Sequence, residues 1–166
     1  ELLDRIRTLA APVWLQLLPE IHASYEEKVH EKVSEKGYLV YDFFLPGLII
    51  DAFLRKSGEY IKQWGEEIVV KRIRTVNMLG CHDGIPLLDL RGLLPEADIQ
   101  RVIDAVVANG GYVKDLHGAK NVYYQVNAAY YSALGGEDAR MLTARAIQLF
   151  MPGRPQVWYL DLFAGE

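Results

Sequence analysis

The pattern of apolar and polar positions divides the chain into short runs that predict strands and longer periodic segments that predict helices. Strands are predicted where apolar, aromatic and β-branched residues follow one another, at 13–22, 38–45, 74–79 and 156–163. Helices are predicted at 1–10, from Ser24 to Gly37, through 49–64 with a break near Gly58, from Pro95 to Asn109, and at about 125–134 and 138–150. The segment 112–121 has the composition of a polar loop.

Two of these helices carry specific signals. Ser24 and Glu27 form a capping-box pair at the start of the first. After Pro95, apolar residues recur at helical spacing along one face until Asn109-Gly110-Gly111. Strands that alternate with helices indicate a parallel sheet covered by helices. The pattern fits either an open doubly wound sheet or half of an eight-stranded barrel.

Composition narrows the class of protein. The chain has 166 residues, 51% of them hydrophobic, which is enough for one sizeable core and a single domain. One cysteine excludes a disulfide framework within the chain, and a net charge of −4 argues against nucleic-acid or anionic-membrane partners. Apolar runs are too short to span a membrane. We therefore expect a cytoplasmic protein. The chain opens without Met and inside a predicted helix, so we expect it to be a piece of a longer protein.

Two predicted strands end in a carboxylate near a histidine. The first ends Pro19-Glu20-Ile21-His22 and the third leads into Cys81-His82-Asp83-Gly84. Functional groups gather at the carboxyl ends of parallel strands, and paired carboxylates are what glycosidic chemistry requires. The alternative is structural, with each carboxylate capping a helix or pairing with a cation and each histidine satisfied in the core. No convincing third ligand accompanies the histidines, so no metal site is predicted.

The segment before the predicted helix at 125 offers further candidates. Lys114, His117 and Lys120 could hold a phosphate, although a solvated loop with ordinary surface charges explains them as well. Tyr124, with Tyr123 beside it at the start of that helix, could stack against a sugar ring. Tyrosines at helical spacing are more often packing groups.

Taken in order, these segments resemble a known family. Leu18-Pro19-Glu20-Ile21-His22, Tyr41-Asp42-Phe43 and Gly80-Cys81-His82-Asp83-Gly84-Ile85 are similar to the fifth, sixth and seventh strands of the α-amylase superfamily, glycoside hydrolase family 13. Tyr124-Gln125-Val126-Asn127 and Pro152-Gly153-Arg154-Pro155-Gln156-Val157-Trp158-Tyr159 resemble its sucrose phosphorylase subfamily. The resemblance covers essentially the whole chain.

The resemblance implies an α/β fold, the C-terminal half of a (β/α)8 TIM barrel, with its fifth to eighth strands and their helices. Residues 1–166 would then be a fragment of one catalytic domain, with an inserted loop and helix region at about 85–125. It assigns Glu20 as general acid/base, Asp83 as transition-state stabiliser and His82 as a ligand of glucosyl hydroxyls. It places His22 on the acceptor side and Gln125 at the substrate or phosphate. The nucleophilic aspartate has no counterpart here and is expected before residue 1, so the chain alone is expected to be inactive.

The implied activity is that of a retaining α-glucoside phosphorylase acting on sucrose or sucrose 6′-phosphate, with inorganic phosphate as co-substrate and no cofactor. Val122 stands where sucrose phosphorylases carry an aspartate, and the nearby cations suit a phosphorylated fructosyl group. A glucosylglycerol or glucosylglycerate phosphorylase is the alternative within the subfamily. A non-catalytic open-sheet binding module is the alternative from another class. A half-barrel exposes sheet edges, so a homo-oligomer is also expected.

Overall fold

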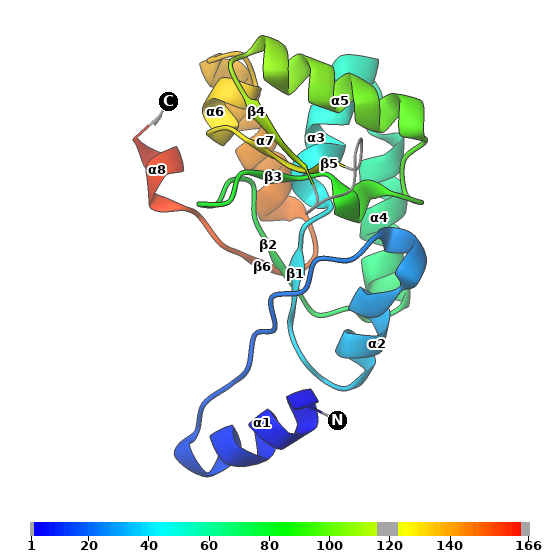
Figure 1. Cartoon of the computed structure of the whole chain (residues 1–166), viewed down its shortest axis with the longest axis vertical. Helices are drawn as coiled ribbons and strands as arrows, with labels where there is room; N and C mark the ends of the chain where they lie inside the picture. The colour runs from blue at the N-terminus through cyan, green and yellow to red at the C-terminus, as the bar shows by residue number, and fades with distance from the viewer. Residues whose placement is uncertain (1, 116–122, 164–166) are drawn as a thin grey trace.

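The computed structural model describes residues 2–115 and 123–163, and it contains two small sheets among helices (Figure 1). The first is parallel, in the order β1-β2-β6, and consists of β1 (Val40–Asp42), β2 (Thr75–Asn77) and β6 (Arg154–Pro155). The second is antiparallel, in the order β3-β5-β4, and consists of β3 (Ile85–Pro86), β4 (Tyr112–Asp115) and β5 (Tyr123–Asn127).

The helices follow the predicted pattern closely. They are α1 (Leu2–Ala10), α2 (Val29–Glu35), α3 (Leu45–Arg55), α4 (Glu59–Val70), α5 (Glu96–Ala108), α6 (Tyr130–Ala133), α7 (Asp138–Phe150) and α8 (Tyr159–Leu162). Short 3-10 turns lie at Ala11–Val13, Tyr25–Glu27 and Leu88–Leu90. The break predicted near Gly58 separates α3 from α4. Ser24 donates its backbone N–H to Glu27 at 2.9 Å, as the capping pair predicts, although α2 itself starts only at Val29.

The core lies between the parallel sheet and the helices α3, α4 and α5. Leu45, Leu48 and Ile49 of α3 are fully buried, and Val102 and Val106 bring the apolar face of α5 against them. Figure 1 shows α1 below α2 and joined to it by an irregular segment, and the Tyr38 hydroxyl donates to the carbonyl of Leu3 in α1 at 2.9 Å. No helix in the described part of the chain is long and apolar enough to cross a membrane.

The first predicted strand, at 13–22, is wrong. Ala11–Val13 forms a 3-10 turn, and residues 15–24 adopt neither helix nor strand in this structure. A strand needs a neighbour that takes its backbone hydrogen bonds, and β1 pairs only with β2 here. The apolar run therefore lacks the backbone hydrogen bonds to a neighbouring strand that would make it a strand.

The last predicted strand, at 156–163, is also wrong in extent. Only Arg154–Pro155 pairs with β2, and the chain then turns into the short helix α8. The carboxylate of Asp161 accepts a hydrogen bond from Arg145 of α7 at 2.8 Å, which draws this segment back towards α7. Tyr159 and Leu162 are two-thirds exposed, so little packing favours a strand there.

The region 112–134 differs from the prediction as well. Tyr112–Asp115, expected in a polar loop, forms β4, and Tyr123–Asn127, expected to begin a helix, forms β5. β5 is paired on both sides, with β3 and with β4, so its backbone groups are satisfied within the sheet. Only the short helix α6 remains of the helix predicted at about 125–134.

Candidate active site

The three parallel strands end beside one pocket. Each strand contributes residues at or just beyond its carboxyl end, and the irregular segment before α2 closes the pocket from the other side. The pocket has a volume of about 140 Å³ and is lined by Glu20, Tyr41, Phe43, Met78, Cys81, His82 and Gln156. The carboxyl ends of parallel strands lie at the same edge of a sheet. Side chains that are far apart in sequence, such as Tyr41 and Gln156, therefore lie around one pocket.

Glu20 and Asp83 both lie near the thiol of Cys81. Burial is the main cause that raises the pKa of Cys81, and the negative charges of Asp83 and Glu20 raise it further. The charge of Glu20 also adds to burial in raising the pKa of the Tyr41 hydroxyl. Glu20 lines the pocket together with Cys81, whereas Asp83 is not among the lining residues and acts on Cys81 through its charge.

His82 and Asp83 form an outward-facing pair on a tight turn. Their atoms Nε2 and Oδ2 are 3.4 Å apart, and the His82 side chain is 77% exposed. Gly84 closes the turn with φ +98°, a conformation that favours glycine. Its backbone N–H donates to the carbonyl of Cys81 at 3.2 Å, and the Cys81 thiol donates back to the carbonyl of Gly84 at 3.5 Å.

His22 lies beside the pocket, in contact with its wall. Its ring stacks on Phe43 with centroids 4.0 Å apart, and Phe43 stacks in turn on Tyr41 at 5.3 Å. Nδ1 of His22 is 3.1 Å from Oδ2 of Asp89, a buried carboxylate in the 3-10 turn after β3. Sequence reasoning missed Asp89, although a single carboxylate within the apolar run Ile85–Leu90 was a signal available in the sequence.

Gln125 belongs to the second sheet rather than to the pocket lining. It is buried in β5 opposite Pro86 of β3, and its Nε2 donates to Oδ1 of Asn127 at 3.2 Å. Since β3 begins two residues after Asp83, Gln125 is connected to the site through one strand pairing. The backbone of Tyr124 lies in β5, while its side chain, together with His117 and Lys120, is outside the described residues.

The chain resembles known phosphorylases over nearly its whole length. No protein-family model matches it. A sucrose 6(F)-phosphate phosphorylase from Ilumatobacter coccineus is 56% identical, over 98% of this chain and 33% of that protein. The chain is homologous to the sucrose 6(F)-phosphate phosphorylases. The resemblance drawn from the motifs is thereby confirmed.

A solved structure agrees with this assignment. The crystal structure of sucrose 6F-phosphate phosphorylase from Thermoanaerobacter thermosaccharolyticum matches with a TM-score of 0.90 at 38% identity, over 98% of this chain and 32% of that one. A glucosylglycerol phosphorylase from Marinobacter adhaerens is 33% identical, over 99% of this chain and 34% of that protein. This phosphorylase homologue therefore spans about a third of the length of the curated relatives it matches.

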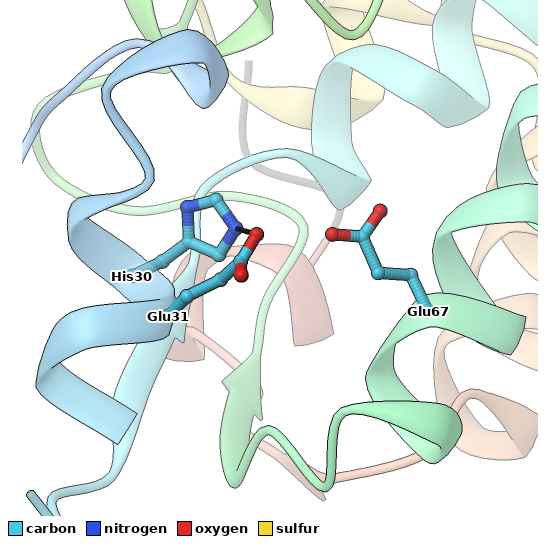
Figure 2. Close-up of side chains that lie close together, drawn as sticks. All are labelled: His30, Glu31 and Glu67. Atoms are coloured by element: carbon cyan, nitrogen blue, oxygen red, sulfur yellow. Dashed lines mark ion pairs between the residues drawn. The ribbon is translucent and has the colours of Figure 1, made fainter. Parts of the chain in front are cut away.

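A second polar cluster of the phosphorylase homologue lies between α2 and α4. His30, Glu31 and Glu67 bring ligand-type atoms within 4.8 Å of one another, and Figure 2 shows the three side chains pointing together. The ammonium of Lys71 donates to both carboxylates at 2.8 Å, and these bonds raise the pKa of Lys71. Burial lowers the pKa of His30 to about 4. Lys28 lies 3.4 Å from Glu31 and 3.8 Å from Glu67, so two lysines balance the two carboxylates, and we interpret this cluster as an ion-pair network that links α2 to α4.

Proposed function

We propose that the protein to which this chain contributes is a retaining α-glucoside phosphorylase acting on sucrose or sucrose 6′-phosphate. The observation that carries the proposal is a pocket at the carboxyl ends of parallel strands that is lined by Glu20 and His82, with Asp83 paired to His82 at 3.4 Å. The homology to sucrose 6(F)-phosphate phosphorylases supports the substrate class.

In the proposed first step, Glu20 donates a proton to the fructosyl oxygen while the glycosidic C–O bond breaks. An aspartate from the part of the enzyme outside this chain attacks the anomeric carbon and forms a glucosyl ester. A phosphate oxygen then attacks the same carbon, the ester carboxylate leaves, and Glu20 takes the proton of the phosphate. The product is α-glucose 1-phosphate with its configuration retained.

The other pocket groups have roles that follow from their charge and position. Asp83 stabilises positive charge that develops on the glucosyl ring in both steps. His82, exposed beside it, offers ring nitrogens to the glucosyl hydroxyls. Tyr41 and Phe43 provide aromatic faces at the pocket wall. We place His22 on the acceptor side and Gln125, Tyr124, His117 and Lys120 around the acceptor and phosphate. No cofactor enters this scheme.

For the fold, we propose that β1, β2 and β6 are the sixth, seventh and eighth strands of a (β/α)8 barrel and that residues 15–24 supply the fifth. The parallel order β1-β2-β6 supports this assignment. We also propose that the region about 85–125 is an insertion in this single domain, since the second sheet starts at residue 85. The chain alone would lack the nucleophile and be inactive. Sucrose turnover by the purified 166-residue chain would overturn this part of the proposal.

We propose a cytoplasmic enzyme whose partners are a sugar or sugar phosphate and inorganic phosphate, with no nucleic-acid or membrane partner. Self-association is part of the proposal, because this chain exposes large apolar side chains. Trp14 is 93% exposed, and Leu2 and Leu9 are more than 70% exposed. Sedimentation of the purified 166-residue chain tests this, and a monomer would contradict the proposed self-association.

The acceptor is tested on the intact enzyme in the reverse direction. Phosphate release from α-glucose 1-phosphate is measured with fructose 6-phosphate, fructose, glycerol and glycerate. We expect the highest kcat/KM with fructose 6-phosphate and the next highest with fructose. The similarity to a glucosylglycerol phosphorylase keeps glucosylglycerol and glucosylglycerate phosphorolysis as the second candidate. A preference for glycerol or glycerate would overturn the sucrose proposal and support that candidate.

A further inference from the structure

The segment that carries Glu20 is held in place without strand pairing. Residues 15–24 belong to neither sheet. In this structure their position relative to the His82-Asp83 turn therefore depends on side-chain and loop contacts. Because acid/base catalysis requires Glu20 to meet the glycosidic oxygen within hydrogen-bond reach, whatever fixes this segment matters for the chemistry.

One buried carboxylate contacts two consecutive residues of this segment. Oδ2 of Asp89 is 3.1 Å from Nδ1 of His22, and Oδ1 accepts the backbone N–H of Ala23 at 3.4 Å. One turn further, the backbone N–H of Glu26 donates to the carbonyl of Arg91 at 3.3 Å. Asp89 is 2% exposed, so its two bonds are made away from water, where charge-assisted hydrogen bonds are strongest.

The same stretch of chain leads directly to the other carboxylate. Asp83 is followed by β3 at Ile85–Pro86, and the turn Leu88–Leu90 that contains Asp89 comes immediately after. Pairing of β3 with β5 holds the start of this stretch. A short, doubly anchored segment therefore connects Asp83 to the residues just after Glu20.

We propose that Asp89 is a positioning residue of the active site, which fixes Glu20 relative to Asp83 by holding His22 and Ala23. The expected changes in rate rest on the proposed function, whereas the expected change at His22 does not. His22, whose other face packs on Phe43, transmits the constraint to the pocket wall. Asp89 also selects the tautomer of His22, because a carboxylate can only accept and Nδ1 must therefore carry the proton.

The substitution Asp89→Asn tests whether Asp89 holds His22, because it should change which ring nitrogen of His22 carries the proton. Asparagine offers one oxygen and one NH2 group, and the backbone N–H of Ala23 requires the oxygen. The NH2 group then faces Nδ1 of His22, which must become the acceptor, so the proton moves to Nε2. In 15N NMR of the histidine-labelled intact enzyme, we expect the protonated nitrogen of His22 to change from Nδ1 to Nε2. The same tautomer in both proteins would overturn the proposal. This measurement succeeds or fails whether or not the enzyme phosphorolyses sucrose.

The kinetic test separates misplacement of the acid from general damage. With sucrose, Asp89→Asn should lower kcat about 10- to 100-fold, since a small displacement of a catalytic group costs that much. With α-glucosyl fluoride, whose leaving group needs far less protonation, the loss should be several-fold smaller. Asp51→Asn is the matched control, because Asp51 is buried and bonded to Arg55 outside the pocket, and it should affect both donors alike. An equal loss with both donors for Asp89→Asn would contradict the positioning role.

A second set of variants serves if Asp89→Asn fails to fold. In His22→Asn the amide nitrogen replaces Nδ1 and can still donate to Asp89, whereas in His22→Gln it lies near the position of Nε2. The proposal expects His22→Asn to keep several-fold more activity on sucrose than His22→Gln. Equal activities, or the reverse order, would show that the contact with Asp89 does not position the site.

Discussion

The indole nitrogen of Trp64 donates to both carboxylate oxygens of Asp42, at 3.1 and 3.0 Å. Asp42 ends β1, and its Oδ1 also accepts the backbone N–H groups of Phe44 and Leu45 at the start of α3. Burial raises the pKa of Asp42 to about 6, and these donors partly offset that effect. The pair therefore connects α4 to the junction between β1 and α3, where Tyr41 and Phe43 are directed at the pocket.

Removing the indole donor should destabilise this junction. In Trp64→Phe, an aromatic ring remains, but the N–H donor and part of the buried indole are lost, so Asp42 loses its main side-chain partner. We expect the free energy of unfolding of the intact protein to fall by about 2–3 kcal/mol in urea titrations. The control Trp14→Phe changes a side chain that is 93% exposed and should cost less than about 0.5 kcal/mol. Similar small losses in both variants would show that the Trp64–Asp42 contact contributes little.

His30 should make stability depend on pH. Its pKa is about 4 in the folded protein because burial disfavours the charged ring, whereas an unfolded histidine titrates near 6.5. Between these values the unfolded state binds more protons, so the free energy of unfolding falls as the pH decreases from about 6.5 towards 4. The full effect of this residue is about 3 kcal/mol at most.

The variant His30→Phe isolates that dependence. Nε2 of His30 is buried without a hydrogen bond, and the ring packs edge-on against Phe44 and Trp64, so phenylalanine suits the site. We expect stability at pH 7 to be preserved and its decline between pH 6.5 and 4 to become shallower. Urea titrations at several pH values measure both. An unchanged slope would mean that burial does not lower the pKa of His30 in the folded protein.

Substitution of Gly84 tests whether the turn that carries His82 and Asp83 packs closely against β5. A Cβ at this position would lie 2.3 Å from the carbonyl oxygen of Val126 in β5, at φ +98°. Gly110 has a similar φ of +92° but open space around it. Gly110→Ala should therefore cost only about 1–2 kcal/mol of backbone strain, and Gly84→Ala at least about 2 kcal/mol more. Thermal unfolding of the two variants compares them. Equal losses would show that the close approach to β5 is not maintained.

Substitution of Lys120 tests whether the enzyme prefers a phosphorylated acceptor. We predict that Lys120→Ala raises the KM for fructose 6-phosphate about 10-fold or more and leaves the KM for fructose nearly unchanged, since one charge-assisted contact to phosphate is lost. Lys62→Ala, on the exposed face of α4, is the matched loss of a lysine and should change neither constant. A parallel rise for both acceptors after Lys120→Ala would remove the assignment to phosphate.

Sequence reasoning located the helices because their signals are local. Pro95 and the Asn109-Gly110-Gly111 stop bound α5, and the apolar spacing between them predicts its buried face. The strands at 13–22 and 156–163 failed for the opposite reason. Whether an apolar run becomes a strand depends on a partner elsewhere in the protein, and the pairing with β2 ends at Arg154–Pro155, just before the second run.

The candidate site was predictable in part. His82 and Asp83 follow β2, at the edge onto which the parallel strands open, as a general rule of α/β folds predicts, whereas Glu20 reaches the same pocket from an irregular segment. Asp89 was not predictable in this way, since its partners His22 and Ala23 are distant in sequence and contact it only through tertiary packing. The role of Gln125 at the substrate or phosphate stays a prediction, and its place in β5 depends on pairing with β3 and β4, which the sequence did not indicate.

The most direct test of the account is the rate of α-glucose 1-phosphate formation from sucrose and phosphate by the intact enzyme carrying Glu20→Gln. The substitution preserves the size of the side chain and removes its ability to donate and accept a proton. We predict a loss of about 100- to 10,000-fold with sucrose and recovery of most of the first step with α-glucosyl fluoride. Transfer from sucrose at the wild-type rate would contradict the assignment of Glu20 and, with it, the proposed mechanism.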